Sequence, residues 1–246
     1  MMSNVKILGH RGWSANYPEN TRLALTQALQ LGVDGTEYDV QLSADGVPVI
    51  LHDPTVDRTT DGTGKVSELT FAQLRAVNAA AAKPECGRQT IPSLSEVLDD
   101  AFAISPQGFY NIEIKVYNPE WRSLVDRVVA VTSQHPLRER ILFSSFEHES
   151  LSYLKTNHPT VKVGLLYEDD PQQPWAAAKF YDAYSVNLNY RFATDEVVSR
   201  CHAHGVKVAV WTVDEPADIL RCLKTGVDVL ISNRPDVALR VMREAR

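Results

Sequence analysis

Residues 5–42 read VKILGHRGWSANYPENTRLALTQALQLGVDGTEYDVQL, and their pattern decides the fold. A β-branched run at 5–9 is followed by a stretch with helical spacing at 20–32, which ends at Gly32, and then by a second β-branched run at 36–42. Strand, helix and strand in this order are typical of a parallel βα unit. The opening of the chain therefore predicts an α/β protein.

The same rhythm continues through the rest of the chain. Further strands are expected at 47–51, 109–115, 140–144, 161–167, 183–189, 206–211 and 227–232. The turn SADG joins the runs at 36–42 and 47–51, which indicates an antiparallel excursion and leaves eight βα units. Eight units favour a closed (β/α)8 TIM barrel. The runner-up is an open doubly wound sheet, but no GxGxxG follows the first strand.

One segment, residues 52–98, interrupts this rhythm. It is rich in Thr, Asp and Gly, and it is far longer than the roughly 2 to 6 residues of an ordinary βα loop. We interpret it as a small insertion after the second barrel strand, at about 54–92, with a short helix at 69–74, inside a single domain that covers 1–246. Loops at that end of a barrel build the active site, so the insertion is expected to cover or shape it.

The composition limits the classes of partner. A formal net charge of −6 argues against nucleic acid, which needs a basic surface. The apolar runs are shorter than the roughly 18 to 20 residues of a membrane span, and the N-terminus lacks the pattern of a secretory signal, so we expect a cytoplasmic protein without stable membrane association. The three cysteines show no metal-binding spacing. The sequence does not predict an oligomeric state.

Polar side chains lie at or near the carboxyl ends of the predicted strands. They are His10, Arg11, Glu37, Asp39, His52, Glu113, Lys115 and Trp211. Residues two apart on a strand face the same side, so Glu37 projects together with Asp39, and Glu113 with Lys115. The interior of a barrel normally holds branched apolar residues, and catalytic groups lie at its carboxyl end. This set therefore indicates an active site.

The charges of this set point to phosphoryl chemistry. Glu37, Asp39 and Glu113 form an all-oxygen set, which suits one hard divalent cation, Mg²⁺ or Ca²⁺, better than zinc. Three carboxylates and a dication leave one negative charge, so an anionic substrate needs further cations nearby. Arg11 can bind two phosphate oxygens, and Lys115 supplies a point charge.

Two histidines complete the set. Near neutral pH one imidazole can take a proton from a nucleophile while the other gives one to the leaving oxygen, and such a pair suits a phosphodiester better than a monoester. The residues alone do not say whether His10 or His52 is the base. The chain has no GxSxG elbow in position for a covalent acyl mechanism.

In this order the motifs resemble those of the glycerophosphodiester phosphodiesterase family, in its bacterial cytoplasmic type. The matching segments are HRG to PEN at 10–20, ExD at 37–39, HD at 52–53, ExK at 113–115, FSSF at 143–146 and GVDVLISNRPD at 226–236. Each motif alone is weak, but the ordered set is specific and extends along the whole chain. The resemblance implies a TIM barrel with a small inserted region that uses a divalent cation to hydrolyse glycerophosphodiesters to sn-glycerol 3-phosphate and an alcohol.

The resemblance also implies roles for individual residues. They are His10 as general base, His52 as general acid, Glu37, Asp39 and Glu113 as metal ligands, and Arg11 and Lys115 as phosphate contacts. Trp211 would line the glycerol pocket, unless it is only a packing residue. Water or the neighbouring glycerol hydroxyl could attack phosphorus, and the sequence does not choose between them.

Five neighbouring residues receive more modest expectations. Asn20 is expected to cap the following helix, and Glu19 to orient a neighbouring side chain. Asp53 is expected to orient His52 or to cap the inserted loop. Ser232 and Asn233, after the last strand, are expected to cap the final helix.

Two other functions remain open beside a phosphodiesterase for small soluble diesters. A lysophospholipase D would use the same chemistry on a lipid, but the inserted segment is too polar to provide an apolar groove. A barrel that binds phosphodiesters without turnover is the third possibility, and the presence of both His10 and His52 argues against it.

Overall fold

Eight parallel strands form a closed barrel in the computed structural model, which describes residues 5–245. Around the ring the order is β1, β9, β8, β7, β6, β5, β4 and β2, and pairing of β1 with β2 closes it. The strands are β1 Lys6–His10, β2 Gly35–Leu42, β4 Tyr110–Ile114, β5 Ile141–Ser145, β6 Lys162–Tyr167, β7 Ser185–Asn189, β8 Lys207–Trp211 and β9 Val229–Ser232. The predicted TIM barrel is confirmed.

A ninth strand lies outside the ring. Strand β3, Pro48–Ile50, pairs antiparallel with the end of β2, and the partners include Val40 with Ile50 and Leu42 with Pro48. This is the antiparallel excursion that the SADG turn predicts.

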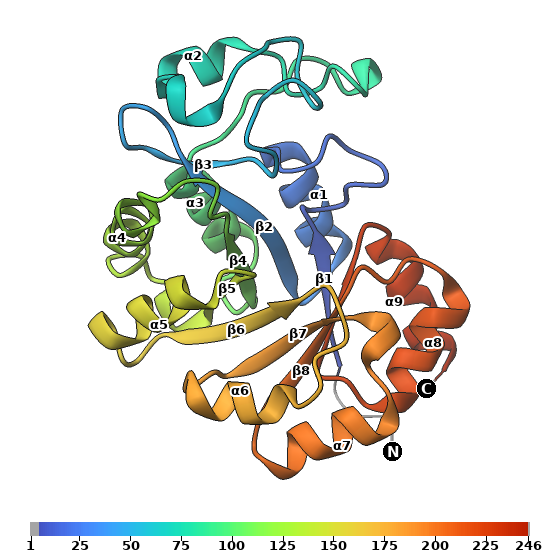
Figure 1. Cartoon of the computed structure of the whole chain (residues 1–246). Coiled ribbons are helices and arrows are strands. Elements are labelled where there is room, and N and C mark those ends of the chain that lie inside the picture. Colours follow the sequence, from blue (N-terminus) through green and yellow to red (C-terminus); the bar gives the residue numbers. More distant parts are fainter. Residues whose placement is uncertain (1–4, 246) are drawn as a thin grey trace.

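Helices surround the barrel and cover its outer face (Figure 1). They are α1 Arg22–Leu31, α3 Leu94–Ile104, α4 Trp121–Thr132, α5 His148–Asn157, α6 Pro174–Phe180, α7 Asp195–Ala203, α8 Pro216–Thr225 and α9 Pro235–Glu244. Outward strand residues such as Tyr38 and Val40 are fully buried in the core between barrel and helices. Within residues 5–245 no helix has both the length and the apolar character that crossing a membrane requires.

The start of α1 differs from the expectation. Thr21, not Asn20, is its N-cap, and the Thr21 side chain accepts a hydrogen bond from the Ala24 amide. Asn20 instead adopts a left-handed backbone conformation, with φ of 57°, and turns its amide toward Asp39. Gly32 ends α1 in the left-handed region, as the sequence predicts.

The inserted segment lies between β3 and α3 and packs on one side of the barrel, next to β3 and α1 (Figure 1). It contains η1 Val66–Glu68, α2 Phe71–Ala76 and η2 Pro84–Cys86. Its own apolar cluster consists of Val49, Leu51, Val56, Val66, Leu74, Ala79 and Ile91. The short helix begins two residues later than predicted because Thr70 caps it in a capping box with Gln73. The interpretation of 1–246 as one domain stays a prediction.

Candidate active site

The carboxylates meet because of the strand register. His10 on β1 is the register partner of Glu37 on β2, and Asp39 is the partner of Glu113 on β4. One oxygen from each of Glu37, Asp39 and Glu113 lies within 4.8 Å of the others, and all three residues are buried. The structure thus brings together the three acids that the sequence singled out.

Burial and mutual repulsion make this cluster unusual. Burial, together with the charges of Asp39 and Glu113, raises the pKa of Glu37 well above its ordinary value. Burial and Asp39 likewise raise the pKa of Glu113 to about 7. Burial alone would also raise the pKa of Asp39, but Lys115 and Arg11 outweigh it and hold that pKa below the ordinary range. Ionising all three acids at once is therefore unfavourable unless a further cation lies among them.

The cluster fits a hard cation. Glu37 Oε1 is buried without a hydrogen-bond partner among the described residues, a costly state for a carboxylate oxygen. Carboxylate oxygens are the ligands that Mg²⁺ and Ca²⁺ prefer. A divalent ion among these oxygens would satisfy Glu37 Oε1 and relieve the repulsion between the three acids.

Two cations border the cluster. The Lys115 ammonium donates to Glu113 Oε1 and lies 3.2 Å from Asp39 Oδ1. Arg11 Nε lies 3.2 Å from Asp39 Oδ2, and Arg11 Nη1 donates to Glu19 at 2.8 Å. Glu19 therefore orients a neighbouring side chain, as expected, and its contacts include Arg11.

A sharp turn after β1 places His10 and Arg11 side by side. Arg11 has a φ of 54° and Gly12 a φ of 83°, and the Arg11 amide donates to Glu37 Oε2 at 3.0 Å. A Cβ on Gly12 would lie 2.4 Å from the carbonyl carbon of Ala24. Only glycine fits there, which explains the HRG sequence at the mouth of the barrel.

An amide fixes the His10 ring. Asn233 Oδ1 lies 2.7 Å from His10 Nδ1, and Asn233 Nδ2 donates to Asp214 Oδ2 at 2.8 Å, which determines the orientation of the amide. Since an amide oxygen can only accept, Nδ1 carries the hydrogen and Nε2 has the free lone pair. That Nε2 lies 3.8 Å from Glu37 Oε2. Burial and the Arg11 charge lower the pKa of His10 to about 4, so its ring is neutral at neutral pH.

This arrangement corrects the expectation for Ser232 and Asn233. Ser232 Oγ accepts a hydrogen bond from the Arg234 amide, but α9 has no side-chain cap at its N-cap residue. Asn233 holds His10 instead. The sequence does not predict this role, because 223 residues separate His10 from Asn233.

A carboxylate holds the second histidine. Asp53 Oδ1 lies 2.6 Å from His52 Nδ1, so Asp53 orients His52, one of its two expected roles. Arg58 of the inserted segment donates to both oxygens of Asp53, at 2.5 and 3.0 Å, and to both oxygens of Glu19, at 2.9 and 2.8 Å. Arg58 thus links the partner of His52 to the partner of Arg11. No motif of the sequence indicated this role for Arg58.

A small cavity of about 140 Å³ connects these groups. His10, Arg11, His52, Glu37, Glu113 and Lys115 form its polar side, and Phe146, Leu166, Trp211 and Ile231 are among its apolar walls. The rings of Phe146 and Trp211 meet edge to face at 5.5 Å, and Trp211 Nε1 donates to the Asn187 carbonyl at 3.1 Å. One half of the cavity suits an anion, and the other suits a carbon skeleton.

Fold and site together define a class, a (β/α)8 barrel whose carboxyl end brings together three buried acids, two cations and two histidines. Within that class, the chain belongs to the glycerophosphoryl diester phosphodiesterase family, whose model matches residues 10–237. The family that the ordered motifs predict is confirmed.

Individual relatives agree over nearly the full length. A glycerophosphodiester phosphodiesterase of Caldanaerobacter subterraneus is 38% identical over 97% of this chain and 98% of its own. One from Bacillus altitudinis is 34% identical over 98% of this chain and 99% of its own. Among solved structures, a phosphodiesterase of Oleispira antarctica in complex with the product sn-glycerol-3-phosphate superposes with a TM-score of 0.90 at 30% identity, and the match covers 97% of this chain and 96% of that one.

Proposed function

We propose that this chain hydrolyses glycerophosphodiesters to sn-glycerol 3-phosphate and an alcohol, with a divalent cation and a pair of histidines. The proposal rests on the different hydrogen-bond partners of the two imidazoles. His10 Nδ1 contacts an amide oxygen, whereas His52 Nδ1 contacts a carboxylate oxygen. The family and the product bound by the Oleispira relative support the substrate class.

His10 is the general base. Its Nδ1–H is engaged by Asn233, so Nε2 faces the carboxylate cluster with a free lone pair. A neutral amide partner does not favour an imidazolium, and His10 therefore stays ready to take a proton from the attacking hydroxyl. Water and the glycerol hydroxyl of the substrate are the two candidate nucleophiles.

His52 is the general acid. The Asp53 carboxylate accepts from Nδ1 and stabilises a positive ring, so a proton at Nε2 can be passed to the leaving alcohol oxygen. Burial lowers the pKa of His52 below its ordinary value, and the Asp39 and Asp53 carboxylates act in the opposite direction. The two histidines have different partners and are available for the two proton transfers of diester cleavage.

The phosphate is bound by the cations beside the acids. Arg11 and Lys115 would each give a hydrogen bond to phosphate oxygens, and both side chains are mostly buried, which strengthens the attraction. Glu37, Asp39 and Glu113 would hold the divalent ion. When bound, that ion, Mg²⁺ or Ca²⁺, would neutralise charge on the phosphate and polarise it. Trp211 and Phe146 would pack against the glycerol carbons.

The test is release of sn-glycerol 3-phosphate from glycerophosphocholine and glycerophosphoethanolamine, with Mg²⁺, with Ca²⁺ and with excess chelator. We expect metal-dependent release that falls at least about a hundredfold in His10→Ala. His158→Ala, at the C-cap of α5, is the matched control and should keep full activity.

Full activity in chelator would exclude the role of the metal, and full activity of His10→Ala would exclude the base. Activity only on lysophosphatidylcholine would establish the lysophospholipase D alternative. Absence of release from any diester would favour a barrel that binds without turnover.

A further inference from the structure

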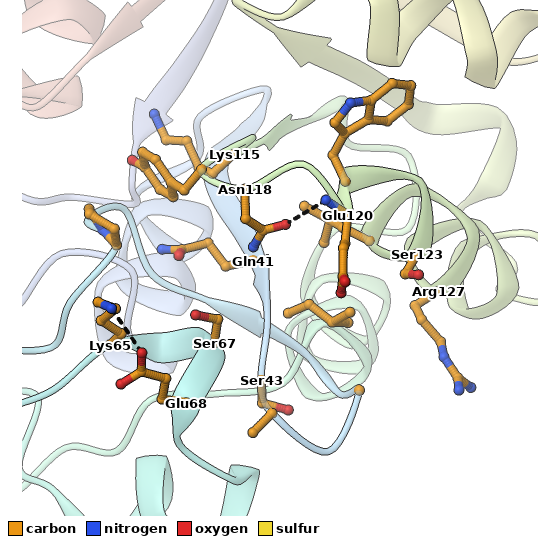
Figure 2. Close-up of a pocket in the computed structure, with 17 residues that line it drawn as sticks. Gln41, Ser43, Lys65, Ser67, Glu68, Lys115, Asn118, Glu120, Ser123 and Arg127 are labelled. Carbon is orange, nitrogen blue, oxygen red and sulfur yellow. Dashed lines mark hydrogen bonds and ion pairs between the residues drawn. The ribbon is translucent and has the colours of Figure 1, made fainter.

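A second, larger cavity of about 610 Å³ lies beside the active site (Figure 2). Three parts of the chain enclose it. These are the end of β2 with its turn, at 41–46, the η1 region of the inserted segment, at 65–68, and the segment from Lys115 to Arg127 that includes the start of α4. The inserted segment therefore forms one complete wall.

The two cavities share a residue and flank the same histidine. Lys115 lines both of them. Tyr117 and Gln41 line the larger cavity, and both hold the backbone of His52, because Tyr117 Oη donates to the His52 carbonyl at 2.6 Å and Gln41 Nε2 donates to it at 3.2 Å. The larger cavity therefore begins on the His52 side, where the proposed acid releases the alcohol.

The two cavities differ in volume, and each suits a different part of the substrate. The smaller one, about 140 Å³, already contains the phosphate-binding cations and the apolar wall for glycerol. Ligand sites for whole small molecules usually measure about 300 Å³ or more, so this cavity cannot enclose a complete diester. The other half of the substrate must extend past Lys115.

The walls of the larger cavity are polar and carry charges of both signs. Serine hydroxyls of Ser43, Ser67 and Ser123 line it, and Figure 2 shows the Asn118 amide and the Glu120 carboxylate turned toward its centre. Lys65 is paired with Glu68 at 2.8 Å. Glu120 and Arg127 contribute one charge of each sign, and the remaining cation, Lys115, is paired with Glu113 and Asp39 of the active site. The walls therefore offer hydrogen-bond donors and acceptors and no large excess of charge of one sign.

Among the described residues, the aromatic ones that line this cavity are Tyr117 and Trp121, too few to surround a quaternary ammonium group. Trp121 is buried, and the Arg122 guanidinium covers its ring at 4.4 Å from the centroid. A choline head group would therefore find no free indole face at Trp121.

We propose that this second cavity binds the leaving alcohol and selects an uncharged, polyhydroxylated one, such as glycerol or a cyclitol. The inference rests on the proposed function and names the substrate class of the same site. Each hydroxyl of such an alcohol can exchange its hydrogen bonds with water for bonds to the serine, amide and carboxylate groups of the walls.

The experiment compares kcat/KM for three diesters of sn-glycerol 3-phosphate, whose alcohols are inositol, choline and methanol. We expect the inositol diester to exceed the choline diester by at least about tenfold. In Ser67→Trp, an exposed position on the inserted wall, the ratio of kcat/KM for the inositol diester to that for the methyl diester should fall about tenfold. Ser199→Trp, an exposed serine on α7, is the matched control and should leave the ratio unchanged.

Asn118→Ala is a second, smaller change in the same cavity and should lower the ratio in the same direction, even if the tryptophan variant does not fold. Preference for the choline diester, or a ratio that neither variant changes, would overturn the assignment of this cavity while leaving the phosphodiesterase intact. Failure of the wild-type enzyme to cleave any of the three diesters would overturn the proposed function itself.

Discussion

Carboxylates occupy both ends of the barrel, and the two ends use them in opposite ways. At the carboxyl end, burial raises the pKa of Glu37 and Glu113, and a buried oxygen of Glu37 has no hydrogen-bond partner in the described chain. At the amino end, Asp228 accepts from the Val208 amide and from Lys207, each at 2.8 Å, and its pKa is lowered because these bonds outweigh burial. At the carboxyl end some carboxylate oxygens of the described residues lack a hydrogen-bond partner, whereas both oxygens of Asp228 at the amino end accept hydrogen bonds.

At the amino end, the same short Gly-Val-Asp segment between a helix and the next strand occurs twice. The segments LGVD at 31–34 and TGVD at 225–228 each place a left-handed glycine at a helix end, a buried valine, and then an aspartate. In both, the aspartate accepts from the amide of the second residue of a neighbouring strand, Ile7 for Asp34 and Val208 for Asp228. Acids whose oxygens are engaged by backbone stabilise the barrel, and acids with free oxygens are available for chemistry.

The strongest test of this contrast is Glu113→Gln. The change keeps the side chain's shape but removes a proposed metal ligand, so kcat/KM should fall about a thousandfold, equivalent to several kcal/mol of lost charge stabilisation. The free energy of unfolding, measured with chelator at pH 8, should not decrease, because the pKa of Glu113 is raised to about 7 and its charge above that pH is unfavourable to the fold. Kinetics and urea unfolding on the same preparation give both numbers.

The sign of this stability effect follows from the direction of the pKa shift. A carboxyl group whose pKa is higher in the folded state than in the unfolded state costs stability as pH rises from its unfolded value through its folded value. The free energy of unfolding of the variant should therefore rise relative to that of the wild type as pH increases from about 4.5 to 7. Below that range the two proteins should not differ. A variant that is clearly less stable at pH 8 would mean that this acid, like Asp228, serves the fold.

Arg58→Gln should have the next largest effect. Arg58 holds Asp53 and Glu19 together, and through them it positions His52 and Arg11. We expect kcat to fall roughly tenfold to a hundredfold with little change in KM, the range found when a partner of a functional side chain is lost.

Two controls separate positioning from folding. The Arg58 side chain is 48% exposed, and exposed ion pairs add only about 0 to 1 kcal/mol to stability, so the melting temperature should change little. Arg58→Lys should recover part of the activity, and Arg88→Gln, an exposed arginine elsewhere in the inserted segment, should keep all of it. A loss of kcat that matched a loss of folded protein would assign Arg58 a structural role only.

The sequence predicted the charged end of the barrel well because the chemistry there is local to each strand. ExD at Glu37 and ExK at Glu113 follow the two-residue period of a strand, so the residues that face the interior could be named directly. Asn233 and Arg58 could not be found in this way. Asn233 lies 223 residues from His10, and Arg58 of the irregular inserted segment lies 39 residues from Glu19 and five from Asp53. Such contacts follow from ring closure and from the fold of the insertion, neither of which leaves a periodic signal.

At the amino end, Asp228→Asn should lower the free energy of unfolding by about 2 kcal/mol, the order of a lost charge-assisted hydrogen bond, while kcat stays unchanged. Both oxygens of Asp228 accept bonds, so an amide must leave one donor without an acceptor. Asp34→Asn is the matched variant. The Ile7 amide donates only to Asp34 Oδ2, and the amide oxygen of an asparagine can accept this bond, so the loss of unfolding free energy should be smaller. Equal losses in the two variants would show that their charge matters more than the number of bonds.

The smallest expected effect is the pH dependence of that loss. Because the pKa of Asp228 is lower in the folded protein than its ordinary value of 3.8, its contribution is present above that value and disappears as pH falls through the folded pKa. The difference in stability between wild type and Asp228→Asn should therefore shrink as pH falls below about 4. This is the reverse of the trend expected for Glu113→Gln, so urea unfolding of the two variants across pH compares the two ends of the barrel directly. If the two differences changed with pH in the same direction, the distinction between satisfied and unsatisfied acids would fail.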